Sequence, residues 1–343
     1  MLRILAYHRV AELRDTPAVD SRTVSATPEG FVLQMKHLAR FYRIVSMPEV
    51  LEAVEKGRPL PKRAVLITFD DAYADFAEIA WPILKQFRFP ATMFVPTACA
   101  NQPERALWWD RLYQAFAATS RTEIDVPGLG RLPLGGQVDG KSEKQIPHCA
   151  RDDNREKRKS LRAIQNRLTT IPHSEAMRLV DSLCDELGLS RAQGGSVLTW
   201  NRLRELAREG LTLGSHTRTH PIMTQATLEQ IREEVQGSQE DLQREIGACL
   251  PIFCYPNGNH NDAVVSVLRE QGIRLAFTTL GGPNNLGSLD PLRLHRTVIM
   301  PRTTPAIFCL RLLRWGIQLD AWRDRKQREV LTRGLPQNFA GPA

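Results

Sequence analysis

The chain has 343 residues, and 42% of them are hydrophobic, which is ordinary for a globular protein of one large or two small domains. The net charge is +8, but no nucleic-acid motif accompanies it, so we expect no nucleic-acid partner. No apolar run approaches the ~20 residues of a membrane span. Six cysteines form no C-x-x-C pair, a pattern that indicates reduced thiols rather than a disulfide framework.

Short apolar runs alternate with helical patterns, which is typical of an α/β fold with a parallel sheet. The expected strands are Leu2–Tyr7, Val65–Phe69, Ala91–Val95, Leu211–Gly214, Ile252–Tyr255 and Leu275–Thr278. The expected helices include Arg155–Thr170, Ser174–Leu187 with Ser174 as its cap, 200–209 and 227–246. Residues 104–197 interrupt the alternation, and we expect a largely helical insertion or cap there.

Two adjacent carboxylates, Asp70 and Asp71, end the run that begins at Ala64. Side chains alternate between the two faces of a strand, but both can face one site where the strand ends and the chain turns. Carboxylates this close repel each other unless a cation lies between them or one of them binds a proton. This favours a metal site in which one carboxylate binds the ion and the other moves protons. The alternative is an Asp pair that begins a solvated helix.

Two histidines, His216 and His220, follow another strand-like run at a spacing of i and i+4. Pro221 disfavours a regular helix at His220, so we expect a loop that turns both rings inward. Two neutral imidazoles and one carboxylate form a ligand set that suits zinc or a similar transition metal, with a position left for water. The alternative is a pair of solvated histidines, and the Asp pair makes the metal interpretation the better one.

A third segment ends a strand in a Pro-x-Gly turn, with the sequence Phe253-Cys254-Tyr255-Pro256-Asn257-Gly258. These three segments together resemble the polysaccharide deacetylase family, the NodB homology domain of chitooligosaccharide deacetylases. Residues 68–72 match the family's Thr-Phe-Asp-Asp-Gly with Ala72 in place of glycine, and residues 216–220 match His-Ser/Thr-x-x-His/Ser in full. The family's usual third motif is Arg-x-Pro-Tyr, and the chain instead resembles a subgroup with Phe-x-Tyr-Pro-x-Gly.

The resemblance implies a distorted (β/α) barrel of seven parallel strands over residues 1–300, with a C-terminal helical extension and tail at 301–343. It also implies a hydrolase that removes N-acetyl groups from amino sugars of a polysaccharide, an oligosaccharide or a lipid-linked precursor. The implied ligands of one divalent ion, for which we favour zinc, are Asp71, His216 and His220. Asp70 is the implied general base, and the backbone N–H of Tyr255 is expected to stabilise the oxyanion.

The general acid is open between two histidines. His295 closes a Leu-Arg-Leu-His stretch that resembles the family's Leu-x-His, and His8 ends the first strand. A structural histidine is the alternative for each. Phe253 occupies the position of the family arginine that orients the base, and we expect the planar guanidinium of Arg296 to replace it, unless Arg296 is a surface residue. If the backbone at residue 72 needs a positive φ, Ala72 is strained there.

Other aromatic residues have two interpretations each. Trp108 and Trp109 either stack on sugar rings or pack as core and rim. After Thr304-Pro305, apolar residues recur at helical spacing at Phe308, Leu312, Trp315, Leu319 and Trp322. They indicate either a helix packed on the barrel, which we favour, or a basic amphipathic segment at 305–328 on a membrane surface.

No signal-peptide pattern precedes the first strand, so we expect a cytoplasmic enzyme, with peripheral contact at the inner membrane face as an option. Two other functions stay open. One is an amidase or deformylase that acts on a small carbon–nitrogen substrate, and the other is an inactive barrel that only binds glycan. The complete Asp, His and His set argues against the inactive barrel. The substrate sugar, its chain length, the metal and the oligomeric state are not determined by these patterns.

Overall fold

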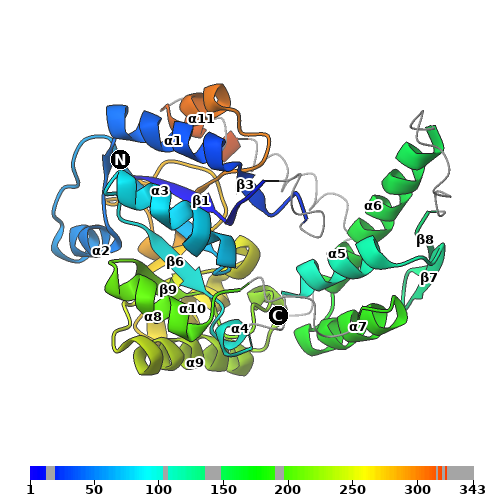
Figure 1. The fold of residues 1–343 in the computed structure, drawn as a ribbon. Helices are drawn as coiled ribbons and strands as arrows, with labels where there is room; N and C mark the ends of the chain where they lie inside the picture. The colour runs from blue at the N-terminus through cyan, green and yellow to red at the C-terminus, as the bar shows by residue number, and fades with distance from the viewer. Residues whose placement is uncertain are drawn as a thin grey trace.

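The structure is a computed structural model that describes residues 1–12, 20–102, 107–135, 148–189, 197–313, 316–318 and 321–322, without the side chains of 148–154. Within these residues the main sheet has eight strands, all paired in parallel. Seven follow one another in the order β11–β10–β9–β6–β5–β1–β12, and β4 pairs with β5 (Figure 1). Their bounds are β1 Arg3–Tyr7, β4 Arg43–Ile44, β5 Ala64–Asp70, β6 Thr92–Val95, β9 Thr212–Ser215, β10 Ile252–Cys254, β11 Leu275–Phe277 and β12 Thr297–Val298.

The sheet curls because one segment reaches both of its ends. Leu294 forms a parallel bridge with Phe277 of β11, and three residues later Thr297 pairs with Leu5 of β1. The segment around β12 therefore lies between the two edges of the sheet. The predicted α/β fold class, a distorted barrel with a parallel sheet, is confirmed.

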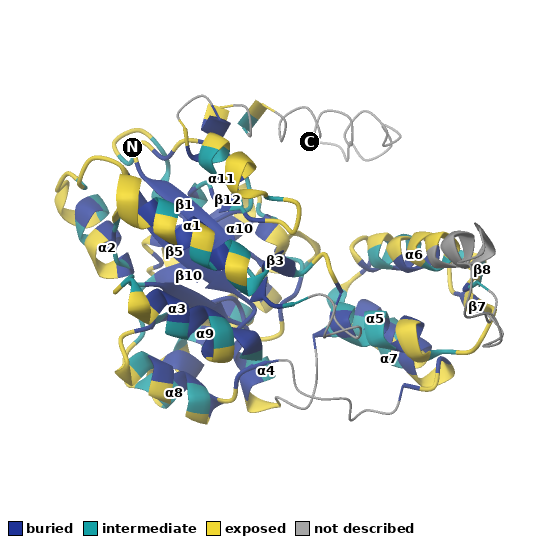
Figure 2. Ribbon diagram, turned by 45° about the horizontal axis from the view of Figure 1, so that its top comes forward, coloured by how far each residue is buried: buried dark blue, intermediate teal, exposed yellow. Residues whose placement is uncertain are grey.

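Both faces of the sheet are buried, which is why the strands read as continuous apolar runs rather than alternating ones (Figure 2). The inner face forms one cluster that includes Ile4, Leu66, Phe94 and Phe277. The outer face packs against surrounding helices, whose bounds are α1 Pro28–Phe41, α2 Met47–Lys56, α3 Trp81–Gln86, α4 Thr97–Asn101, α8 Trp200–Arg208, α9 Leu228–Ile246 and α10 Asp262–Glu270. Shorter helical turns are η1 Phe76–Ala80, η2 Met223–Gln225, η3 Pro256–Gly258 and η4 Pro291–Arg293, and a small β2–β3 pair joins Arg9–Val10 to Val24–Ala26.

Residues from the predicted insertion form a second body beside the barrel (Figures 1 and 2). It contains α5 Trp108–Ala118, the hairpin β7 Glu123–Val126 and β8 Gly130–Pro133, α6 His148–Leu168 and α7 His173–Glu186. These elements share a core of their own, which includes Leu112, Phe116, Ile164, Val180 and Leu183. The predicted limits, 104 and 197, remain a prediction, since 103–106 and 190–196 lie outside the described residues.

The C-terminal helix α11, Pro305–Leu312, packs on α1, and Phe308 is buried between them. It ends earlier than the apolar spacing suggests, because the chain turns back and a Cβ at Gly316 would clash with the carbonyl oxygen of Leu310. Trp315 and Leu319 lie outside the described residues. Among the described helices, none has the length and apolar character needed to cross a membrane.

Candidate active site

The Asp pair lies where β5 ends. Asp70 is the last residue of the strand, and the next two residues, Asp71 and Ala72, have positive φ angles of 71° and 52°. The predicted strain at Ala72 is therefore present, and such a conformation costs on the order of 1–3 kcal/mol unless its surroundings hold it. Here they do: the N–H of Leu198 donates to the carbonyl of Ala72 at 2.8 Å, and Tyr73 bridges to Val197.

The histidines lie on the loop after β9, as predicted, and the loop is held from two sides. Both Thr217 and His220 have positive φ angles, 66° and 58°. The hydroxyl of Thr217 accepts a hydrogen bond from the N–H of His220 at 3.0 Å. A carboxylate oxygen of Glu234 on α9 accepts from the N–H groups of Arg218 and Thr219 at 2.7 and 2.9 Å. These bonds turn both imidazoles toward the end of β5.

Asp71, His216 and His220 form a buried triad with the geometry of a metal site. Oδ1 of Asp71 lies 3.5 Å from Nε2 of His216 and 3.5 Å from Nε2 of His220. Nδ1 of His216 lies 2.8 Å from the carbonyl oxygen of Cys254, which can only accept, so Nδ1 carries a proton and Nε2 is the nitrogen available to an ion beside Asp71.

Two observations show that this triad fits a divalent cation. No described residue makes a hydrogen bond of normal geometry to Oδ1 of Asp71, although this oxygen is fully buried, and a buried charge without partners is costly. Burial alone would lower the pKa of His216, but Cys254, Asp71 and Asp70 raise it well above its ordinary value. The surroundings of these atoms therefore favour positive charge. One carboxylate and two imidazoles match zinc and similar ions.

Asp70 is held by Arg296 through two parallel hydrogen bonds. Nη1 donates to Oδ1 at 2.8 Å and Nη2 to Oδ2 at 2.6 Å, while Nε of the same arginine donates to the carbonyl of Thr278 at 2.8 Å. Both side chains are buried. Burial alone would raise the pKa of Asp70, but the guanidinium of Arg296 outweighs this effect, so the pKa lies far below its ordinary value. Arg296 is thus not the surface residue of the alternative interpretation, and Asp70 stays ionised.

Of the two histidines considered as general acid, the structure brings only His8 to the site. Its Nε2 lies 4.0 Å from Oδ2 of Asp71, and its side chain is 27% exposed. Leu294 packs in the inner cluster and Arg296 points at Asp70, so the ring of His295 between them faces the other way. It lies against Gly282, where a Cβ would clash with it. The expectation for His295 is corrected accordingly.

The role expected of Tyr255 also needs correction. Its backbone N–H donates to the carbonyl of Phe277 at 3.1 Å, so the sheet already uses the donor that was expected to bind an oxyanion. Its hydroxyl donates to the carbonyl of Leu292 at 2.8 Å, away from the triad. The neighbouring Cys254 faces the site instead, with Sγ 3.6 Å from Oδ2 of Asp70. Strand alternation explains this: Phe253 and Tyr255 face the outer helices, and Cys254 faces inward.

A buried network that the sequence did not reveal connects α5 to the site. The ring of Trp109 meets that of His220 edge to face, with centroids 4.7 Å apart, and its Nε1 donates to the hydroxyl of Tyr73 at 2.8 Å. The guanidinium of Arg9 lies 4.5 Å from the centre of the Tyr73 ring and pairs with Asp75 at 2.7 Å. The sequence signal for this network was closeness along the chain to predicted site residues: Tyr73 and Asp75 come just after the Asp pair, and Arg9 comes just after His8.

The sequence profile of the polysaccharide deacetylase family matches residues 57–121 and 163–276, just over half of the chain. The chain therefore belongs to this family, whose members hydrolyse carbon–nitrogen bonds other than peptide bonds.

Two curated relatives are poly-β-1,6-N-acetyl-D-glucosamine N-deacetylases. The one from Escherichia coli K12 is 22% identical over 317 residues, which cover 84% of this chain and 35% of the relative. The one from Staphylococcus epidermidis is 33% identical over 102 residues, which cover 27% of this chain and 35% of the relative. The chain thus matches about a third of the length of these relatives.

Solved structures show the same fold. The Streptococcus pyogenes deacetylase PplD in complex with acetate aligns with a TM-score of 0.57 and 19% identity, covering 90% of this chain and 96% of that one. IcaB from Ammonifex degensii aligns with a TM-score of 0.56 and 19% identity over 90% and 95% of the two chains.

Proposed function

We propose that the protein is a metal-dependent deacetylase that removes N-acetyl groups from amino sugars of a polysaccharide, an oligosaccharide or a lipid-linked precursor. The observation that carries this proposal is the buried triad of Asp71, His216 and His220 beside an Asp70 whose two oxygens are bound by Arg296. The triad offers ligands for a cation, and the neighbouring carboxylate is ionised and fixed in orientation. Metal-assisted amide hydrolysis needs this combination.

In this proposal Asp71, His216 and His220 hold one divalent ion, with zinc as our choice, and Asp70 takes a proton from water. A bound ion of this kind lowers the pKa of its water and polarises a carbonyl. Arg296 holds Asp70 so that a carboxylate oxygen stays within reach of that water. His8, on the more exposed side of Asp71, donates a proton to the leaving amine from Nε2.

The substrate proposal draws on the relatives and on the third motif. Two of them are named for poly-β-1,6-N-acetyl-D-glucosamine, and we propose a β-linked N-acetylglucosamine chain for this protein as well. We also assign the chain to the subgroup with Phe-x-Tyr-Pro-x-Gly, since Cys254 in that motif faces Asp70 and provides the carbonyl that fixes His216.

The test measures acetate release from N-acetylglucosamine oligomers, formate release from a formylated amine and ring opening of a cyclic amide, each with and without a chelator. We expect release from the oligomers, loss with chelator and recovery on adding zinc. Preference for the formylated or cyclic compound would instead support an amidase or deformylase. Binding of oligomers without any hydrolysis would support an inactive glycan-binding barrel.

We further propose that the chain consists of a barrel at 1–300, the insertion at 104–197 within it and an extension at 301–343. Contact with a membrane surface is proposed for the extension. Three of its apolar side chains, Ile307, Leu310 and Leu313, are 42–45% exposed. The cytoplasmic location stays a prediction.

A further inference from the structure

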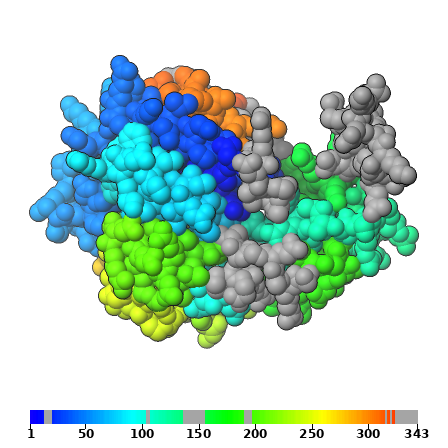
Figure 3. All heavy atoms as spheres, viewed as in Figure 1, coloured from blue at the N-terminus to red at the C-terminus, as the bar shows by residue number. Residues whose placement is uncertain are grey.

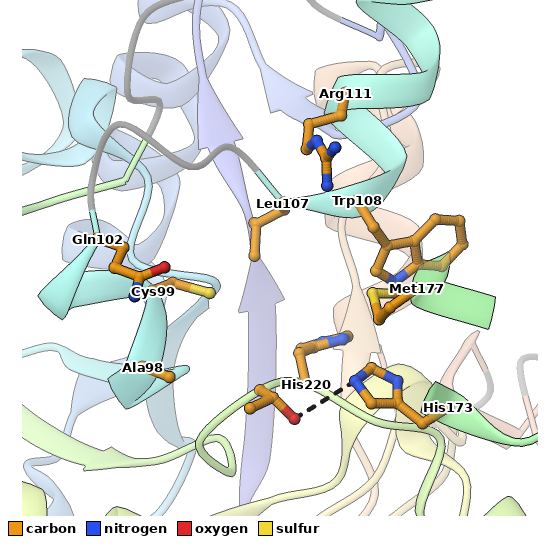
Figure 4. Close-up of a pocket in the computed structure, with 10 residues that line it drawn as sticks. Ala98, Cys99, Gln102, Leu107, Trp108, Arg111, His173, Met177 and His220 are labelled. Carbon is orange, nitrogen blue, oxygen red and sulfur yellow. Dashed lines mark hydrogen bonds between the residues drawn. The ribbon is translucent and has the colours of Figure 1, made fainter. Parts of the chain in front are cut away.

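A cavity of about 180 Å³ lies beside His220, between the barrel and the insertion (Figure 4). On the barrel side it is lined by α4 and the loop after β9, and on the insertion side by α5 and α7. A cavity of this size has room for several waters or for a single small ring. His220 belongs both to the triad and to the cavity wall, so only this side chain separates an occupant of the cavity from the proposed metal.

The cavity has one aromatic wall whose orientation is fixed by the site. Trp108 lines the cavity, and its ring meets that of Trp109 edge to face at 5.3 Å and 85°. Trp109 in turn packs on His220. Both tryptophans are half-buried, but they have different neighbours: Trp109 contacts His220 and Tyr73, while Trp108 lines the cavity. Met177 of α7 adds a second apolar contact.

Four polar side chains also line the cavity. Gln102, Arg111, His173 and Thr219 contribute amide, guanidinium, imidazole and hydroxyl groups, and no described residue that lines the cavity is acidic. The charge of Arg111 is balanced by Asp181 at 2.7 Å. Burial lowers the pKa of His173, whose Nε2 lies 3.4 Å from the hydroxyl of Thr219, so this imidazole is neutral near pH 7.

We propose that this cavity is a subsite for a neutral, N-acetylated sugar ring that is linked to the sugar being deacetylated, with Trp108 as its platform. The inference rests on the proposed function and deepens it. An aromatic face suits the C–H face of a pyranose, and the polar walls suit its hydroxyl and acetamide groups. A deacetylated sugar carries an ammonium group, and the described carboxylates next to the lining residues already have partners: Asp181 pairs with Arg111, and Glu234 accepts from the N–H groups of Arg218 and Thr219. The protein should therefore prefer acetylated neighbours and act on chains rather than on single sugars.

The experiment compares β-1,6-linked N-acetylglucosamine oligomers of one to four sugars on metal-loaded protein. In the wild type we expect kcat/KM to rise on going from one sugar to two or three. Trp108→Ala should reduce this gain about tenfold, since the lost stacking is worth on the order of a factor of ten, and Trp108→Phe should keep most of it. Phe87→Ala is the matched control, because it truncates a half-buried aromatic ring at the end of α3, outside the cavity.

Binding of the trimer to metal-loaded Asp70→Asn, measured by calorimetry, separates the subsite from the reaction. If Trp108→Ala weakens trimer binding about tenfold in that background, the subsite stands even where the wild type releases no acetate. If the wild type releases acetate but its dependence on chain length is the same with Trp108→Ala, the subsite is refuted and the proposed function stands. Equal binding of a trimer with a deacetylated neighbour would overturn the preference for a neutral ring.

Discussion

Two neighbouring carboxylates acquire different chemistry because they have different partners. Asp70 ends β5, and each of its oxygens accepts one hydrogen bond from a terminal nitrogen of Arg296. At Asp71 the chain turns with a positive φ, and Oδ1 is left facing the imidazoles of His216 and His220. The difference is therefore set by the turn and by a residue more than 200 positions away, and it supports separate roles as base and ligand.

The first prediction concerns Asp70. Asp70→Asn keeps the shape of the side chain but removes the group that takes the proton from water. We expect the variant to bind metal as the wild type does and to lose about 10²–10⁴-fold in kcat, the usual contribution of a positioned acid or base. Metal content and kcat measured on the same preparation test this, and a near-normal kcat would refute the role.

The second prediction concerns Arg296. Arg296→Lys keeps the charge but cannot donate to both oxygens of Asp70, so Asp70 loses its fixed orientation. We expect kcat to fall at least tenfold while metal content is unchanged. Arg293→Lys is the matched control, since Arg293 pairs with Asp262 near the surface. A fully active Arg296→Lys would show that only charge matters there.

Among the individual site residues, the sequence predicted those that lie in compact motifs. Asp70 is the last residue of a parallel strand, Asp71, His216 and His220 come after such strands, and these strand ends meet at one edge of the sheet. The choice between His8 and His295 could not be made, because it depends on which face of the chain each ring occupies. The backbone N–H of Tyr255 donates to the carbonyl of Phe277 because the two strands pair, and no local sequence pattern reveals that pairing.

Among the elements, α5 stands out because it connects the insertion to the proposed metal site. Its Trp109 contacts His220 and donates to Tyr73, which directly follows the strained turn at Asp71 and Ala72. The chain comes back to the same turn at Val197, which bridges to Tyr73. The insertion thus meets the barrel at the residues that orient two of the three proposed ligands, and it should help to hold them.

The third prediction tests this link. Trp109→Phe keeps an aromatic ring near His220 but removes the donor to Tyr73, and Tyr73→Phe removes the acceptor. Because outer groups that fix ligands commonly contribute 10–100-fold in metal affinity, we expect each variant to weaken zinc binding about tenfold in a chelator competition. Tyr113→Phe removes a hydroxyl from the same helix and serves as control. Unchanged affinity in both variants would limit Trp109 and Tyr73 to packing.

The strands were the most predictable elements. Their predicted bounds agree with β1, β5, β6, β9, β10 and β11 to within one residue, because strands buried on both faces give short continuous apolar runs. Ser174 was predicted to cap α7, but the helix already begins at His173, so Ser174 lies inside it. The end of α11 at Leu312 depends on a close approach of the chain at Gly316, a tertiary effect.

On the scale of the whole molecule, apolar residues gather on one surface. Leu33 and Phe41 of α1 and Ile307, Leu310 and Leu313 around α11 are each at least 40% exposed. The two helices pack against each other, and Figure 3 shows their atoms side by side in blue and orange. Two exposed basic side chains of α1 accompany them, namely Lys36 and Arg40. Apolar groups among positive charges suit an anionic lipid surface.

The fourth prediction concerns this surface. The full chain should float with vesicles that contain anionic lipid at low salt and float less at high salt, since each Lys or Arg near such a surface adds about 1 kcal/mol and salt screens it. Replacing Ile307 and Leu310 by serine should reduce flotation. Leu228→Ser, at a leucine 47% exposed on α9, should not. Absence of flotation at low salt, or no effect of the two serines, would make α11 a packing helix only.

Metal analysis of purified protein tests the central claim most directly. The account predicts one divalent ion for each wild-type chain, retention of that ion in Asp70→Asn, and its loss in His216→Ala and in His220→Ala, whose rings lie 3.5 Å from the same oxygen of Asp71. Circular dichroism of each variant would show that the fold is kept. Wild-type occupancy in both histidine variants, with the fold intact, would contradict the account, since the ion would then lie elsewhere.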